Sequence, residues 1–153
     1  MIEPVIRPAT SADGAAVRAL VLRILTEYGL SLDPHGTDAD LDDIGAAYRG
    51  GRFWVLDEGG EIVGSCALYP VGGGAVQLRK MYLEPRLRGR GWGRRLLEQA
   101  LAAARADGHR RVELETASVL KEAIRLYQQY GFARIDGCSP DAQRCDQSWA
   151  LEL

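Results

Sequence analysis

A continuous stretch from Val76 to Leu97 constrains the fold more than any other part of this 153-residue chain. Its first part, through Leu83, is rich in apolar and aromatic residues, which predicts a strand. Pro85 then ends the strand, because proline cannot donate a hydrogen bond to a sheet. A glycine-rich turn follows, and apolar residues recur at helical spacing from Leu96 onward. The stretch therefore predicts a strand, a tight turn and a helix.

The turn has the composition of an anion-binding site. Its sequence is Arg88-Gly89-Arg90-Gly91-Trp92-Gly93-Arg94. The first amides of a helix lack internal partners, and glycines allow a phosphate to approach them. The glycine spacing matches neither a P-loop nor a dinucleotide fingerprint. Seven basic residues lie in or near the turn, namely Arg79, Lys80, Arg86, Arg88, Arg90, Arg94 and Arg95. We therefore expect a ligand with several phosphate charges.

The remaining elements follow from capping, turn and alternation patterns. Residues 10–13 and 37–40 are capping-box sequences and predict two helices, the second reaching about Tyr48. Further strands are predicted at 5–7, 52–57, 61–69, 111–116, 132–135 and 145–153, with a helix over 119–130 and a polar loop over 136–146. The order β-α-α-β-β-β-α-β-α-β-β predicts an α/β fold, with helices on both faces of a mixed sheet. We expect a single domain spanning residues 1–153.

The turn and a later segment resemble signatures of the GCN5-related N-acetyltransferases. Arg88, Gly91 and Gly93 occupy the positions of the family's Gln/Arg-x-x-Gly-x-Gly/Ala signature. The run from Ala123 to Phe132 resembles its Ala-x-x-Leu-Tyr-x-x-x-Gly-Phe segment. The order of predicted elements is also that of the family, so the resemblance covers essentially the whole chain. It implies an enzyme that uses acetyl-CoA to acetylate a primary amine by direct transfer in a ternary complex.

The resemblance also implies where acetyl-CoA binds. The main-chain amides from Arg88 to Arg94 would hold the pyrophosphate. A bulge would splay the strand that ends at Leu83 from its parallel neighbour, so that the main chain of Met81 and Leu83 pairs with the pantetheine arm. Tyr82 and Ala123 complete the cofactor-binding residues that the resemblance implies.

Tyr127 is the candidate catalytic acid. The family's tyrosine at this position lies beside the thioester sulfur, and a phenol is suited to protonate a departing thiolate. The alternative reading is structural, because Leu120, Ile124 and Tyr127 fall on one helical face and predict a core aromatic. Spacing alone favours the structural reading, whereas the family resemblance favours the acid.

Two positions depart from the family pattern. Gln77 stands where many relatives have glutamate, and Leu120 where many have asparagine, so neither can act as a base. The base is then expected to be Glu115, or else Glu27, Tyr28 or a water chain, and an amine that arrives partly deprotonated would need no dedicated base. Glu27, Tyr28 and Arg79 are the expected substrate-binding residues. The structural alternative for Glu115 is a strand-end ion pair with Arg79 or Arg111.

Two groups of charged residues, of opposite sign, suggest what kind of acceptor the protein binds. The acidic residues Asp33, Asp38, Asp40, Asp42 and Asp43 either complement a helix start or form a lid that attracts a cationic amine. Arg79 and Lys80 are instead suited to bind an acceptor carboxylate. An amino acid or another small zwitterion would satisfy both signals, and a polyamine-like amine only the first.

The composition of the chain limits which binding partners and which cellular location are expected. A net charge of −2 gives no drive toward nucleic acid or anionic membranes. No signal peptide or membrane-spanning run is apparent. Three cysteines, Cys66, Cys138 and Cys145, favour reduced thiols and a cytoplasmic location. With only His35 and His109, no metal site is expected.

Other functions fit parts of the pattern. Gln77 and Leu120 are compatible with a coenzyme A-sensing module that catalyses nothing. A protein N-terminus as acceptor would make the chain a protein N-acetyltransferase. The arginine-rich turn could contact RNA, although only Trp92 is nearby for stacking on bases. The resemblance also allows a homodimer.

Overall fold

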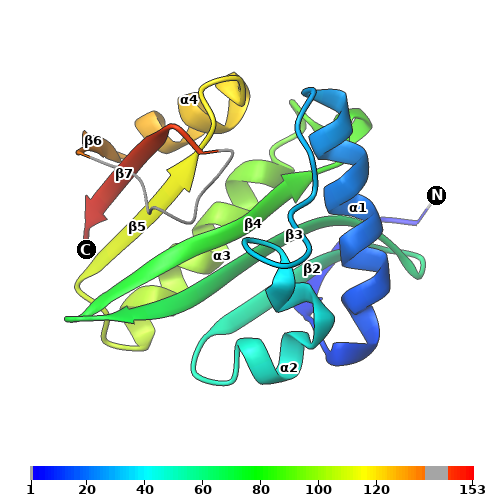
Figure 1. Cartoon of the computed structure of the whole chain (residues 1–153), viewed down its shortest axis with the longest axis horizontal. Coiled ribbons are helices and arrows are strands. Elements are labelled where there is room, and N and C mark those ends of the chain that lie inside the picture. Colours follow the sequence, from blue (N-terminus) through cyan, green and yellow to red (C-terminus); the bar gives the residue numbers. More distant parts are fainter. Residues whose placement is uncertain (1, 137–144) are drawn as a thin grey trace.

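The computed structural model describes residues 2–136 and 145–153, whose strands form one seven-stranded sheet (Figure 1). The strands are β1 (Val5–Pro8), β2 (Arg52–Glu58), β3 (Glu61–Gly72), β4 (Ala75–Leu83), β5 (Arg111–Thr116), β6 (Ala133–Ile135) and β7 (Gln147–Glu152). Their spatial order is β1-β2-β3-β4-β5-β7-β6. Only β4 and β5 pair in parallel, and the other neighbours are antiparallel. The predicted α/β class with a mixed sheet is confirmed.

Helices cover both faces of this sheet, as predicted (Figure 1). They are α1 (Gly14–Glu27), α2 (Ile44–Ala47), α3 (Trp92–Ala106) and α4 (Lys121–Gln129). Successive residues of β2 point to opposite faces, as strand geometry requires. Phe53 and Val55 therefore pack into the core beneath α1, whereas Trp54 packs into the core beneath α3.

The predicted hairpin and the first capping box are confirmed. β2 and β3 are joined by Gly59 and Gly60, which both have positive φ. The Asp13 carboxylate accepts a 2.8 Å hydrogen bond from the Thr10 amide, at the short 3₁₀ turn Ser11–Asp13 that precedes α1. Such local patterns need only a few neighbouring residues, which explains why they are readable from the sequence.

The predicted second helix is wrong. Instead of one helix from the capping box at residues 37–40 to Tyr48, the chain forms a 3₁₀ turn at Ala39–Asp42 and the four-residue α2. The cap of α2 is Asp43, whose carboxylate accepts from the Ala46 amide at 3.1 Å. Asp38 and Asp40 turn their side chains inward to Lys80, so neither serves as a cap.

A bulge interrupts β4 and opens the sheet. Arg79 pairs with Ala67 and Tyr82 with Ser65, so two residues of β4 face one residue of β3. Lys80, the first of the two, has a φ of +55°. Pairing of β4 with β5 stops at Gln77, and the two strands diverge beyond it (Figure 1). The splay implied by the family resemblance is confirmed.

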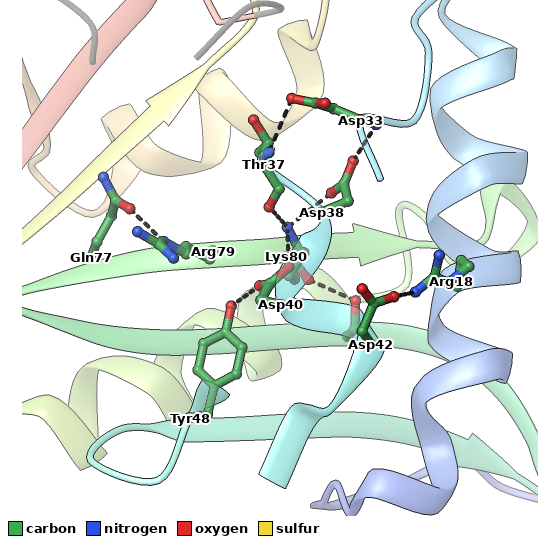
Figure 2. Close-up of polar contacts among 11 residues, drawn as sticks. Arg18, Asp33, Thr37, Asp38, Asp40, Asp42, Tyr48, Gln77, Arg79 and Lys80 are labelled. Atoms are coloured by element: carbon green, nitrogen blue, oxygen red, sulfur yellow. Dashed lines mark hydrogen bonds and ion pairs between the residues drawn. The ribbon is translucent and has the colours of Figure 1, made fainter. Parts of the chain in front are cut away.

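The Lys80 side chain is buried and ties the loop before β2 to this bulge (Figure 2). Its Nζ lies 2.9 Å from the Asp38 carboxylate, 2.8 Å from the Thr37 carbonyl oxygen and 3.2 Å from the Asp40 carboxylate. Asp40 also accepts a hydrogen bond from the Tyr48 hydroxyl. Lys80 is therefore occupied by the protein itself, and its predicted role as ligand of an acceptor carboxylate is wrong.

The spatial order of the last two strands is the reverse of their order in the chain. The final strand, β7, lies between β5 and β6, and pairs with both. The sequence predicted two closing strands but not this order. Residues 137–144 of the predicted polar loop, which include Cys138, lie outside the described residues.

Replacing Lys80 with methionine should lower the free energy of unfolding by about 3–5 kcal/mol, because two buried carboxylates lose their cation. Urea unfolding followed by circular dichroism measures this change. Lys121→Met, at the exposed start of α4, is the matched control and should change the value by less than about 0.5 kcal/mol. Equal stability of the two variants would contradict a structural role for the buried ammonium.

Candidate active site

A cavity of about 680 Å³ opens where β4 and β5 part. Its walls come from these strands, from α4 and from the loop after α1. Residues singled out from the sequence that line it are Asp33, His35, Gln77, Arg79, Lys80, Met81, Tyr82, Glu115, Leu120, Ala123 and Tyr127. The structure thus brings both predicted catalytic residues into one cavity.

The glycine-rich turn has the geometry of an anion site. Gly89 and Gly91 have φ of +74° and +88°, and a Cβ at either position would meet nothing within 4 Å. The first intrahelical bond of α3 is donated by the Arg95 amide to the Gly91 carbonyl. The amides from Trp92 to Arg94 therefore have no partner within the helix.

The turn lies beside the cavity, at the end of β4. A Cβ at Gly93 would lie 3.6 Å from Leu126 on α4 and 4.0 Å from Leu83 on β4. Met81, Tyr82 and the α4 residues of the cavity belong to these same two elements. A ligand with its phosphates at the turn can thus extend along β4 into the cavity.

Two of the arginines around the turn are paired with carboxylates of the protein. Arg88 donates to Glu27 at 2.7 and 3.0 Å, and Arg86 pairs with Glu58. Within the described chain, Arg90, Arg94 and Arg95 form no ion pair. These three cations therefore supply the positive charge that remains near the turn.

Glu27 and Tyr28 lie outside the described lining of the cavity. Both contact Arg88, with the Tyr28 hydroxyl 3.1 Å from its guanidinium. Trp92 is buried in a small cluster with Leu56 and Val63, and so packs against the sheet. The structure places these residues as supports of the turn.

The edge of β4 that faces β5 carries unpaired main-chain groups. The Glu84 amide donates to the Val63 carbonyl on β3 at 2.9 Å. Because main-chain groups alternate along a strand, those of Leu83 and Met81 point to the opposite side, where β5 no longer pairs. The Leu83 carbonyl accepts from Arg88 at 3.1 Å, which leaves Met81 as the residue better able to pair with a ligand.

The Tyr127 side chain is both a core aromatic and a wall of the cavity. Its residue is 5% exposed and its ring centroid lies 5.6 Å from that of Phe132. Burial, above all, raises the pKa of Tyr127 well above its usual range, so the phenol stays protonated at neutral pH. No described residue forms a hydrogen bond with its hydroxyl. The geometry leaves the proton available to a ligand.

Glu115 contacts Gln77 across the splay. The Gln77 Nε2 donates to Glu115 at 3.4 Å, and its Oε1 accepts from Arg79. The predicted ion pair of Glu115 with Arg111 is wrong, since Arg111 lies 2.8 Å from Glu113 and 3.0 Å from Glu152. Arg79 forms no ion pair with any carboxylate in the described ranges. Gln77 is thus the link between the two charged side chains.

The acidic stretch borders the cavity at Asp33, and its role as an amine-attracting lid stays a prediction. Asp38 and Asp40 bind Lys80, Asp42 pairs with Arg18 and Asp43 caps α2. Asp33 lines the cavity and accepts from the Thr37 amide at 3.0 Å. All five carboxylates thus contact groups of the protein itself, with Lys80 and Arg18 as their cationic partners in the described ranges.

Some lining residues were not predicted to belong to the site. Thr116 and Ala117 come from the end of β5, and Cys145, which the sequence analysis named only as a reduced thiol, precedes β7. These segments meet because β7 pairs with β5, with Thr116 opposite Gln147. No local sequence pattern predicts the pairing of β7 with β5. These lining residues could therefore have been predicted only from the order of the strands in the sheet.

Residues 2–136 and 145–153 contain neither a cluster of metal-ligating side chains nor a membrane-spanning helix. No group of three or more His, Cys, Asp or Glu side chains in this part is placed to hold a metal ion. None of its helices is both long enough and apolar enough to cross a bilayer.

The splayed strands, the glycine-rich turn and the tyrosine-lined cavity define an acetyltransferase fold. The chain matches the model of the "Acetyltransferase (GNAT) family" over residues 19–132. The protein therefore belongs to this family and is an N-acetyltransferase.

Particular relatives agree with this assignment. The chain is 38% identical over 146 residues to the "Uncharacterized N-acetyltransferase YjgM" of Escherichia coli (strain K12), which covers 89% of this chain and 87% of that protein. A GNAT-family acetyltransferase from Staphylococcus aureus Mu50 has the same fold, with a TM-score of 0.90 at 21% identity over 98% of this chain and 99% of that one. A phosphinothricin acetyltransferase from Sinorhizobium meliloti, solved in complex with AcCoA, has a TM-score of 0.76 at 17% identity, over 99% of this chain and 89% of that one.

Replacing Gly91 with alanine should weaken acetyl-CoA binding about tenfold, since the Cβ enters the open space in which the phosphates would lie. The strain of a Cβ at this φ lowers the stability of the fold by about 1–2 kcal/mol. Calorimetric titration with acetyl-CoA measures the change. Gly108→Ala is the matched control, because Gly108 has a φ of +83° in similarly open space just beyond α3. Both variants should lose similar stability, and an unchanged Kd in the Gly91 variant would argue against phosphate binding at this turn.

Proposed function

We propose that the protein transfers the acetyl group of acetyl-CoA directly to the primary amine of a small molecule, such as an amino acid or a polyamine-like amine. The observation that carries this proposal is the cavity in which Tyr127 and Glu115 lie, beside an unpaired strand edge and an open anion-binding turn. Its chemistry matches the reaction class of the family.

The residues present fit acetyl-CoA. The amides of the turn from Arg88 to Arg94 would hold the pyrophosphate, with Gly89 and Gly91 leaving space for it. The main chain of Met81 would pair with the pantetheine arm, and Ala123 would lie along it. When bound, acetyl-CoA supplies an acetyl group activated as a thioester.

The proton transfers fall to two residues of the cavity. Glu115 takes the proton that the amine loses as the amide forms. Tyr127 gives its proton to the departing sulfur, a role suited to a phenol that burial keeps neutral. Both residues return to their starting states by exchange of protons with water.

Direct transfer, without an acetylated cysteine, agrees with the surroundings of Cys66. Burial raises the pKa of this thiol to about 12, which keeps it in the unreactive protonated form. Cys145 lines the cavity, so its replacement tests the same point there. The Cys145→Ala variant should retain turnover, whereas complete loss would favour a covalent acetyl-cysteine.

Two measurements test the proposed function. Calorimetry should detect acetyl-CoA binding at micromolar concentrations. A panel of amino acids, polyamines, other small amines and N-terminal peptides, followed by release of the free thiol, then identifies the acceptor class. Absence of binding would remove the proposal, and turnover of peptides alone would replace it with protein N-acetylation.

Replacing Tyr127 with phenylalanine should lower kcat about 100- to 1000-fold, because the departing sulfur loses its proton donor. The Kd of acetyl-CoA should stay within about threefold, since the ring and its packing remain. Tyr130→Phe, on the turn that follows α4 and outside the described lining of the cavity, is the matched control. Full turnover by the Tyr127 variant would exclude this residue as the acid.

A further inference from the structure

Arg79 is a cation in the cavity with only neutral partners. Its guanidinium carbon lies 4.0 Å from the centroid of the Tyr69 ring, and its Nε donates to the Gln77 side chain (Figure 2). Within the described ranges no carboxylate lies at ion-pair distance from it. Partial burial weakens its hydration, so an anionic group of a ligand would be favoured there.

The neighbouring Lys80 keeps the acidic loop from filling this role. Its ammonium binds Asp38 and Asp40, the two carboxylates of the loop that turn inward beside Arg79 (Figure 2). One ammonium thus holds both carboxylates, and a net charge of −1 remains on these three buried groups. Neither carboxylate pairs with Arg79, whose guanidinium keeps neutral partners in the described ranges and stays available to an anionic group of a ligand.

Gln77 sets the spacing between Arg79 and a carboxylate on the facing strand. Its Oε1 accepts from Arg79 and its Nε2 lies 3.4 Å from Glu115, which fixes the orientation of the amide. One amide group thus separates a positive from a negative side chain along the cavity wall. An ammonium and a carboxylate on the same carbon, each with one hydrogen bond, would span a comparable gap.

We propose that the acceptor carries a carboxylate beside its amine, as an α-amino acid does, with the carboxylate on Arg79 and the amine at Glu115. This inference rests on the proposed function and selects one acceptor class within it. Arg79 can offer its terminal nitrogens to both oxygens of a carboxylate, which gives recognition by shape as well as charge. Glu115 would hold the amine in the cavity that Tyr127 also lines.

Matched pairs of acceptors test the inference with the intact protein. The twenty L-amino acids, their carboxamides and spermidine are compared by kcat/KM from free-thiol release. The best amino acid should exceed its own amide by about 100-fold, because the amide leaves the guanidinium without its anion. The amine of an amide is less basic and more often unprotonated, so this bias opposes the expected result.

Variants of Arg79 identify the side chain responsible. Arg79→Gln should bring the ratio of acid to amide close to one, and Arg79→Lys should retain part of the preference because the charge remains. Arg105→Gln, on the exposed side of α3, is the matched control and should keep the native ratio. If Arg79 had only a structural role, its replacement would lower kcat/KM equally for the acid and for the amide, and their ratio would not change.

The outcomes separate this inference from the proposed function. If spermidine or the amides equal the acids while acetylation proceeds, or if Arg79→Gln keeps the native ratio, the inference is overturned and the proposed function stands. If acetyl-CoA does not bind and no amine is acetylated, the proposed function fails and the inference with it. A strong preference for acids that disappears in Arg79→Gln supports both.

Discussion

The contact of the Lys80 ammonium with the carboxylates of Asp38 and Asp40 is the interaction on which the rest of the site depends. Lys80 is part of the β4 bulge and has a φ of +55°, a conformation that residues with a side chain seldom adopt. Charges buried this deeply are tolerated only when they meet one another. The bulge and the loop before β2 are therefore stabilised together, and the bulge in turn parts β4 from β5 to open the cavity.

The same contact decides which charges face a ligand. Asp38 and Asp40 bind the buried Lys80 and so do not face the cavity as free carboxylates. Arg79, next to Lys80, lines the cavity and has neutral partners. Gln77, which cannot act as a base, instead joins Arg79 to Glu115. A position that departs from the family pattern thus acquires a positioning role through its two neighbours.

Sequence patterns predicted well those features that depend on neighbouring residues. The glycine-rich turn, the amphipathic α3 and the β2–β3 hairpin all formed where expected. The family resemblance correctly implied the bulge and the splay. The capping box at Thr37 was misleading, because its acidic residues have a stronger partner in Lys80, 42 residues away from Asp38. The order of β5, β7 and β6 was equally hidden, since strand pairing is decided by packing across the whole sheet.

By itself, the sequence determined most of the elements, the mixed sheet, the glycine-rich turn and the resemblance to the acetyltransferase family. Only the tertiary structure decided what the charged side chains do: Lys80 became internal, Glu27 and Tyr28 became supports of Arg88, and Arg79 became the cation of the cavity. The physical reason is that local backbone preferences act between adjacent residues. The state of a charge depends instead on its burial and on partners that folding brings from distant parts of the chain.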